Sequence, residues 1–366
     1  GTWPVCSRWH RRNRRPVRGG PLPALTERID HRRLPEGDRT LEYNPFSRET
    51  QTNPYPAYKW LRDEAPVYDN ADIGFWALSR FDDVLSGYRD WERLTSTGGV
   101  ALEEVGTGSA PSMIGMDPPM QTKLRKLIVR AFNPKRVGAL EPRIRALTTR
   151  LLDGIVEDGE CDLIARFAAL LPSNVISTLL GAPEADHERL RIWTEQLMHR
   201  EDGESAIPAA ASEAAAGLLG YFGELITTKR EQPGEDLVSA LVEASLEGRR
   251  LDDREILGFC FLLISGGNET TEKLIANTIH QLARHPEQRD RVVADPSLIP
   301  RAIEESLRFR SPTQYMIRTA RDAFEIHGRT IPAGERVLLL IGAANPDPRR
   351  FEAPDRFDID REIAQH

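Results

Sequence analysis

The sequence is poor in cysteine and has no long apolar run. None of its hydrophobic stretches approaches the roughly 18 residues that indicate a membrane-spanning helix. Cys6, Cys161 and Cys260 are widely spaced and form no disulfide framework, CxxC pair or CxxCH sequence. The eight histidines show no HExxH or comparable metal-binding spacing. These absences argue against a membrane span, a disulfide-stabilised fold and a zinc site, and they favour the reducing cytoplasm.

Charge is unevenly distributed along the 366 residues. Residues 1–40 carry ten arginines and four acidic side chains, whereas the remaining residues carry 39 basic and 52 acidic ones. The first segment is also rich in Gly and Pro, which predicts a disordered arm over residues 1–40 and a folded domain over residues 41–366. The arm can be a solvated tail or can contact nucleic acid or anionic lipid. The acidic body argues against nucleic acid as the main partner.

A long helix is predicted from Asp253 to Arg284. Asp252 or Asp253 can cap its N-terminus, and His285-Pro286 ends it. A helix of this length spans ~48 Å, which exceeds most helices of globular proteins. Its first half is apolar on every side, so we expect a buried central helix.

The middle of this helix contains residues that burial disfavours. Gly266 and Gly267 each cost about 1 kcal/mol relative to Ala inside a helix, and a buried Glu269 needs compensation of its charge. A glycine pair removes side chains from one patch, so a flat group can approach the backbone, with Glu269 and Thr270 at its edge to relay protons. Close helix packing at the glycines, with a solvated Glu269, is the alternative that spacing leaves open.

Periodicity predicts a mostly helical chain with small β-sheets. Helices are expected over residues 55–64, 80–85, 137–155, 163–180, 187–198, 209–229 and 297–309. Short strands are expected over residues 67–68, 75–78, 316–319, 324–327 and 337–341.

Four segments, taken in order, resemble the cytochrome P450 family. The hexapeptide Gly266-Gly-Asn-Glu-Thr-Thr271 resembles the oxygen-activating motif (A/G)-G-x-(D/E)-T-(T/S) of these monooxygenases. Met116-Asp-Pro-Pro-Met-Gln-Thr-Lys-Leu-Arg125 is similar to M-D-P-P-x-H-x-x-x-R, Glu305 and Arg308 form E-x-x-R, and residues 354–357 form P-x-R-F. The resemblance implies a cytochrome P450 fold from about residue 43 onward, with residues 96–111 over the substrate pocket and residues 199–212 as a lid.

The resemblance also implies haem b (iron protoporphyrin IX) as cofactor. Arg125 and Arg318 are then expected to bind the haem propionates. Gln121 replaces the histidine of the family, so its contact would be an uncharged hydrogen bond. Gly266 and Gly267 leave room for oxygen and substrate.

The remaining roles follow from the same resemblance. Thr270 is expected to hydrogen-bond dioxygen, and Glu269 to help deliver the protons that cleave it. Glu305, Arg308 and Arg356 are expected to form a structural triad that fixes the segment carrying the haem ligand.

The chain departs from the family near its last residue. The F-x-x-G-x-x-x-C-x-G loop, which brings the iron-binding thiolate, should follow Phe357 within roughly ten residues, but the sequence stops at His366. Cys260 lies ~15 Å before Thr270 on the same helix and is no substitute. We therefore expect a fold that is incomplete at the C-terminus, with the metal ligand beyond His366.

The predicted activity is that of a haem-thiolate monooxygenase. It would insert one oxygen atom from O2 into an apolar small molecule, with electrons from NAD(P)H delivered by a ferredoxin or flavoprotein reductase. Two alternatives remain: a non-catalytic remnant or binding module, and a peroxide-driven or non-oxygenating enzyme on the same fold. An intact Glu269–Thr270 pair argues against the last, because peroxide-driven relatives do not need it.

Overall fold

The computed structural model describes residues 42–102, 112–132, 134–201, 206–246 and 248–366. The predicted arm over residues 1–40 lies outside these ranges. So do residues 103–111 of the predicted pocket loop and residues 202–205 of the predicted lid. The fold is mostly helical with small sheets, as the sequence predicts.

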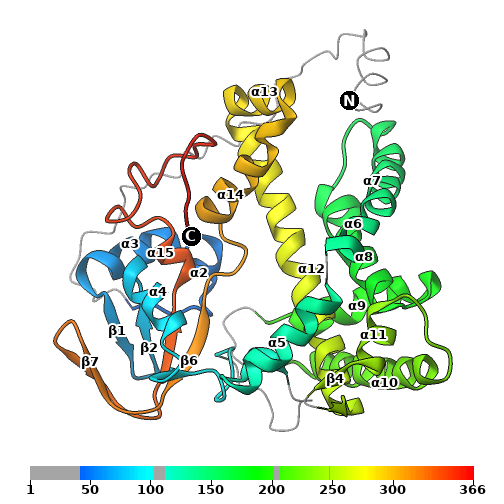
Figure 1. The fold of residues 1–366 in the computed structure, drawn as a ribbon. Coiled ribbons are helices and arrows are strands. Elements are labelled where there is room, and N and C mark those ends of the chain that lie inside the picture. Colours follow the sequence, from blue (N-terminus) through cyan, green and yellow to red (C-terminus); the bar gives the residue numbers. More distant parts are fainter. Residues whose placement is uncertain (1–41, 103–111, 133, 202–205, 247) are drawn as a thin grey trace.

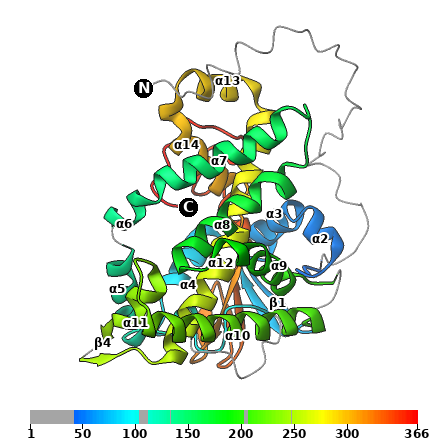
Figure 2. The same ribbon diagram turned by 90° about the vertical axis from the view of Figure 1, so that its right-hand side faces the viewer.

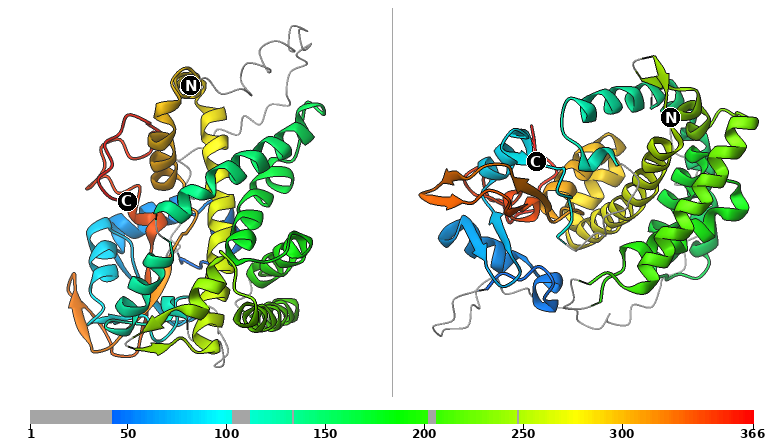
Figure 3. Two further views of the ribbon diagram at one scale, coloured as in Figure 1. Left: turned by 45° about the vertical axis from the view of Figure 1, so that its right-hand side comes forward. Right: turned by 90° about the horizontal axis from the view of Figure 1, so that it is seen from below.

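Helix α12 (Asp253–Arg284) runs through the middle of the molecule. The part built on the largest sheet lies on one side of it, called here the sheet-containing part, and a mostly helical part, called the helical part, lies on the other (Figures 1 and 3). The helical part comprises η1 (Met113–Gly115), α5 (Met120–Ala131), α6 (Pro134–Ala139), α7 (Glu141–Val156), η2 (Ile164–Ala168), α8 (Leu170–Leu180), η3 (Glu184–Asp186), α9 (His187–Met198), α10 (Ala209–Glu231), α11 (Leu237–Glu243), β4 (Ser245–Leu246) and β5 (Arg249–Arg250). After α12 follow α13 (Pro286–Ala294), η4 (Pro296–Leu298) and α14 (Ile299–Phe309).

A capping box fixes the start of α12. The Asp252 carboxylate accepts from the Glu255 N–H at 2.9 Å, and the Glu255 carboxylate accepts from the Asp252 N–H at 2.9 Å. Two of the free N–H groups at the helix start are thereby satisfied. Arg249 donates to the same Glu255 at 2.6 Å and ties the β4–β5 hairpin to the helix. Asp252 is therefore the cap, and α12 has the predicted bounds.

The first half of α12 is buried in the helical core. Ile256, Phe259 and Ile264 pack with Leu218 and Phe222 of α10, which crosses near this end of α12 (Figure 2). Burial of an apolar side chain of this size stabilises by about 2 kcal/mol. The all-round apolar pattern therefore predicted the environment of this half correctly.

The sheet-containing part is built on a five-stranded sheet. Its order is β1 (Val67–Asn70), β2 (Phe75–Leu78), β9 (Arg336–Leu339), β6 (Met316–Ala320) and β3 (Leu94–Thr95). Strands β2 and β9 are parallel, with Trp76 opposite Val337, and the other neighbours are antiparallel. The hairpin of β7 (Phe324–Ile326) and β8 (Arg329–Ile331) is separate, and α2 (Arg48–Thr52), α3 (Tyr55–Glu64), α4 (Phe81–Arg89) and α15 (Ile341–Ala344) complete this part.

Some element boundaries differ from prediction. The single helix predicted over residues 137–155 is wrong, because α6 and α7 are separate and Pro142, in the first turn of α7, has no N–H to continue a helix. The strand predicted over residues 337–341 ends at Leu339, and Ile341 begins α15. Helices α11 and α13 were not predicted. No helix in the described ranges is long and apolar enough to cross a membrane.

The turn after α8 provides a test of the packing between α8 and α11. Gly181 has φ +85°, and a Cβ there would lie 2.4–2.7 Å from side-chain atoms of Asp236. We expect Gly181→Ala to lower the free energy of unfolding by about 3 kcal/mol, from backbone strain plus the clash. Gly159→Ala is the matched control, since Gly159 has φ +77° but open surroundings, and should cost about 1 kcal/mol. Urea denaturation measures both, and equal losses would contradict the clash.

Candidate active site

The two glycines in the middle of α12 have different surroundings. A Cβ on Gly267 would lie 3.2 Å from Cγ1 of Ile176, so this glycine allows α12 to approach α8. Gly266 is exposed, and a Cβ there would meet nothing within 4 Å. Close helix packing therefore applies to Gly267, whereas Gly266 leaves a patch of the helix without a covering side chain. Gly266 and Thr270, one turn apart, form an uncovered strip on the helix, called here the open strip.

Thr270 and Glu269 lie at the open strip, and both have local partners. The Thr270 hydroxyl donates to the Gly266 carbonyl oxygen at 2.8 Å, one turn back. The Glu269 carboxylate forms an ion pair with Lys273, one turn forward. The Glu269 side chain is 29% exposed, so it is partly buried and still accessible to solvent.

Further acids lie beside Glu269. Burial raises the pKa of Glu272, and the nearby carboxylates of Glu195 and Glu269 raise it further. Arg191 of α9 pairs with both Glu188, at 2.6 Å, and Glu195. Helix α9 and the middle of α12 thus share a network of charges that can exchange protons with solvent.

Helix α5 carries two of the residues predicted to hold the propionates. Gln121 is half-buried, and its amide oxygen accepts from the Thr122 hydroxyl at 3.5 Å. Arg125, one turn later, is exposed and has no ion pair with any residue in the described ranges. Leu124 between them is buried in the same core as the first half of α12, which anchors α5 to that helix.

Arg318 lies on β6, in the sheet-containing part. Its guanidinium donates to the Ile317 carbonyl oxygen at 2.7 Å and lies 5.2 Å from the ring centroid of Tyr88 on α4. Burial lowers the pKa of Arg318. The structure does not bring Arg318 into contact with Arg125 or the open strip.

The chemistry of these residues indicates which parts of a haem group they could hold. An uncovered helical strip and the unpaired guanidinium of Arg125 fit a flat apolar group that carries carboxylates. The thiols fit less well. Cys260 is buried in the helical core, where burial raises its pKa to about 12, and Cys161 is exposed between α7 and η2. The described residues therefore fit the porphyrin and its carboxylates, whereas their cysteines do not supply an axial thiolate.

The E-x-x-R pair of α14 is the most buried ion pair of the described chain. The Arg308 guanidinium donates from Nε and Nη2 to the two oxygens of Glu305, each at 2.8 Å, and both side chains are at most 1% exposed. Arg308 Nη1 also donates to the carbonyl oxygens of Asn345, at 3.1 Å, and Pro354, at 3.0 Å. This single side chain therefore joins α14 to the segment that follows α15.

The third member of the predicted triad is placed differently. The Arg356 side chain is 71% exposed and lies 3.9 Å from Asp358. The contact of Arg356 with Arg308 is made by the Arg356 carbonyl oxygen, which accepts from Arg308 at 3.4 Å. Arg361 instead places Nε 3.4 Å from Glu305 and is 11% exposed. Sequence reasoning did not single out Arg361, because its spacing from Pro354 matches no motif that we used. A second arginine five residues after Arg356 was the available signal.

Asp117 is a further polar residue that the sequence did not single out. It belongs to the M-D-P-P segment before α5 and accepts from the Ser96 N–H at 2.9 Å, from the Thr95 hydroxyl, and from Arg321 at 2.5 Å. Burial alone would raise the pKa of Asp117, but these hydrogen bonds and the Arg321 charge lower it overall. Asp117 thus fastens the start of α5 to β3 and to the end of β6.

Comparisons with known proteins agree with this architecture. A family model described as Cytochrome P450 matches residues 213–361. The chain is 42% identical over 331 residues to putative cytochrome P450 123 of Mycobacterium tuberculosis, covering 89% of this chain and 82% of that relative. It is 37% identical over 341 residues to cytochrome P450 monooxygenase PikC of Streptomyces venezuelae, covering 89% and 79%. The structure of CYP109E1 from Bacillus megaterium in complex with corticosterone has a TM-score of 0.77 at 33% identity, covering 87% of this chain and 83% of that chain.

The arrangement around Glu305 predicts unequal effects of two arginine substitutions. We expect Arg361→Ala to lower the free energy of unfolding by about 2 kcal/mol, because it removes a charged partner from a buried carboxylate. Arg356→Ala should cost less than about 0.5 kcal/mol, because its side chain is exposed. Chemical denaturation of both variants checks this. A larger loss for Arg356→Ala would place Arg356, not Arg361, beside Glu305.

The hydrogen bonds of Asp117 predict a dependence of stability on pH. A carboxyl group whose pKa is lowered by folding stabilises the fold above its unfolded pKa of about 3.9, and this stabilisation is lost as pH falls through the folded pKa. Asp117→Asn should therefore destabilise by about 1 kcal/mol at pH 7, after allowance for solvent screening. The difference from wild type should shrink below about pH 4.

Asp322→Asn is the control for Asp117→Asn, because Asp322 is an exposed acid two residues after the end of β6. Thermal melts from pH 3 to pH 8 should show a pH-dependent difference for Asp117→Asn alone. A constant difference at all pH values would contradict the assignment.

Proposed function

Because this chain belongs to the cytochrome P450 family, we propose that it inserts one oxygen atom from O2 into an apolar small molecule, with haem b as cofactor. The observation that carries the proposal is the open strip of α12, where an uncovered glycine lies one turn from Thr270, with Glu269 beside it. In this proposal residues 41–366 form the P450 domain and residues 1–40 an arm. A cytoplasmic location is inferred from the cysteine content.

Haem, when bound, supplies the iron that activates dioxygen. The chain's own residues would then bind its carboxylates. The Arg125 guanidinium is suited to this because it is charged at every physiological pH and has no competing ion pair among the described residues. Arg318 would have to leave the Tyr88 ring to reach a carboxylate, and Gln121 can donate only a neutral hydrogen bond.

Proton handling is assigned to Thr270 and Glu269. The Thr270 hydroxyl donates to the Gly266 carbonyl oxygen, and a rotation about its side-chain bond would turn the same proton toward the open strip. Glu269 would take up a proton from solvent after release from Lys273. Because ion pairs one turn apart on a helix contribute only about 0.3–0.5 kcal/mol, Lys273 does not prevent this movement.

The substrate class and the electron donor are also part of the proposal. CYP109E1 is described in complex with corticosterone, a largely apolar molecule, which supports an apolar substrate here. Electrons would come from NAD(P)H through a ferredoxin or flavoprotein reductase. Lys126 is exposed on α5 and Lys123 lies on the same helix, and basic side chains of this kind complement an acidic electron donor.

Substitution of Thr270 tests the proton-handling assignment. In the haem-loaded protein, we expect Thr270→Ala to leave NAD(P)H consumption within about twofold of wild type while product formed per NAD(P)H falls about tenfold, because proton delivery is misdirected. Hydrogen peroxide released per turnover should rise correspondingly. Thr271→Ala, the next residue and also exposed, is the matched control.

Unchanged coupling in Thr270→Ala would overturn the role of Thr270. Full product formation by wild type from peroxide alone, with no response to NAD(P)H and an electron donor, would instead favour the peroxide-driven alternative.

A further inference from the structure

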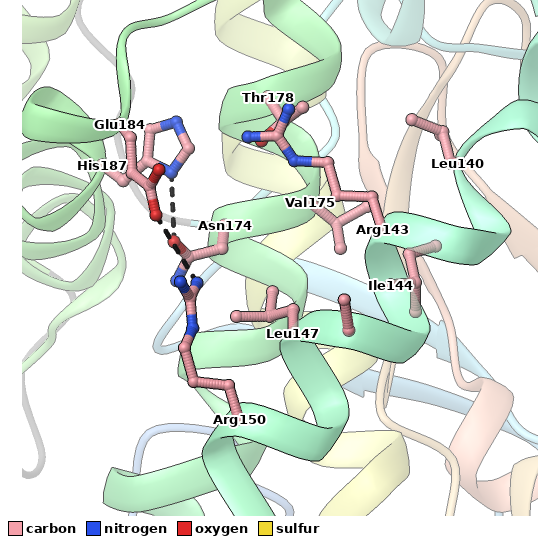
Figure 4. Close-up of a pocket in the computed structure, with 11 residues that line it drawn as sticks. Leu140, Arg143, Ile144, Leu147, Arg150, Asn174, Val175, Thr178, Glu184 and His187 are labelled. Carbon is pink, nitrogen blue, oxygen red and sulfur yellow. Dashed lines mark hydrogen bonds and ion pairs between the residues drawn. The ribbon is translucent and has the colours of Figure 1, made fainter.

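A cavity lies away from the open strip of α12, between α7 and α8. It has a volume of about 390 Å³, and the start of α9 closes one end of it (Figure 4). Residues of α8 that line it, including Val175 and Thr178, lie on the side of that helix opposite Ile176, which packs against Gly267 of α12. The cavity is therefore separated from the open strip by the body of α8. Its size falls within the range of small-molecule sites.

The floor of this cavity is apolar. Leu140, Ile144 and Leu147 come from successive turns of α7, and Val175 faces them from α8 (Figure 4). Burial of a hydrocarbon against this floor would stabilise the complex by about 25 cal/mol per Å² of apolar area removed from water. The floor alone fits any apolar body, so the charged rim determines the class of ligand.

Two polar groups at one end of the cavity have no partner among the described residues. The Arg143 guanidinium points toward Thr178 across the groove between α7 and α8 (Figure 4). Neither side chain makes a hydrogen bond or ion pair with any residue of the described ranges. A guanidinium and a hydroxyl that converge in this way can donate together to one carboxylate.

The other end of the cavity carries a buried histidine. Nδ1 of His187 lies 3.0 Å from Oδ1 of Asn174, and Nε2 lies 3.2 Å from the Ala182 carbonyl oxygen. Asn174 is oriented by its own Nδ2, which donates to the Leu170 carbonyl oxygen at 2.8 Å. These contacts fix the orientation of the His187 ring at this end of the cavity.

The charges that line the cavity do not cancel. Arg143 and Arg150 are positive, and Glu184, 3.5 Å from Arg150, is the only acid among the lining residues. The net positive potential favours an anion and disfavours a neutral or cationic ligand of the same shape.

We propose that this cavity binds an amphipathic monocarboxylate. The carboxylate accepts from Arg143 and from the Thr178 hydroxyl, and the hydrocarbon body lies along Leu147 and Val175. The site lies on α7 and α8 and does not depend on the chemistry assigned to Thr270.

Calorimetric titration of the haem-loaded protein with octanoate tests the site. Octanol is a control that has the eight-carbon chain but no carboxylate, and acetate is a control that has the carboxylate but no long hydrocarbon chain. We expect octanoate to bind at least tenfold more tightly than either. Arg143→Gln should raise the octanoate Kd at least tenfold, and Thr178→Val, which keeps the shape and removes the hydroxyl, about threefold. Arg145→Gln, on the same helix but outside the cavity, should leave the Kd unchanged.

Each outcome decides the proposal. Loss of binding in the two cavity variants with normal binding in Arg145→Gln supports the site. Octanoate binding that survives both cavity variants, equal affinity for octanol, or no binding to wild type overturns it. The haem absorption spectrum is recorded in parallel: a spectral shift that accompanies variant-independent binding places octanoate in the substrate pocket instead. None of these results bears on the role of Thr270, so failure of this proposal leaves the proposed oxygenation untouched.

Discussion

The buried ion pair between Glu305 and Arg308 is the constraint on which the sheet-containing part depends. Taking two charges out of water costs several kcal/mol per ion, and only complete hydrogen bonding offsets that cost. Here Arg308 donates two hydrogen bonds to Glu305 and further hydrogen bonds to carbonyl oxygens of the segment after α15. Arg361 forms an additional ion pair with Glu305. Because every donor and acceptor depends on the position of the others, α14 and residues 345–361 can adopt only this mutual arrangement. The pair therefore provides specificity rather than a large net stabilisation.

Helix α12 meets a packing requirement and leaves an open surface with adjacent residues. Gly267 faces α8 and permits close approach, whereas Gly266, rotated by about 100°, faces open space. One glycine alone could not do both, because successive residues point in different directions. The same rotation separates Ile264, buried in the core, from Thr270 at the open strip. A long helix can thus belong to the hydrophobic core along one side and leave the other side uncovered for the proposed chemistry.

Sequence patterns predicted this fold well where one strong local signal governs an element. The caps and the proline that bound α12, and the spacing within α3 and α9, gave their ends correctly. Prediction failed where residues far apart in the sequence determine which side chains or helices meet. Arg361 displaces Arg356 at Glu305 because the chain turns after residue 357, and no local pattern records that turn. The cavity between α7 and α8 also depends on how two helices diverge, which no periodicity within either helix specifies.

The parallel pairing of β2 with β9 has a consequence for how the protein is made. Trp76 and Val337 are neighbours in the sheet but 261 positions apart in the chain. The helical core, by contrast, draws its buried residues from 124–264. Domains form during synthesis as their residues emerge, and non-local strand pairing is slow. The ribosome must therefore release the helical core well before β2 can find its partner, so β1 and β2 spend most of translation as an unpaired hairpin edge, the stage at which a chaperone would have most to protect.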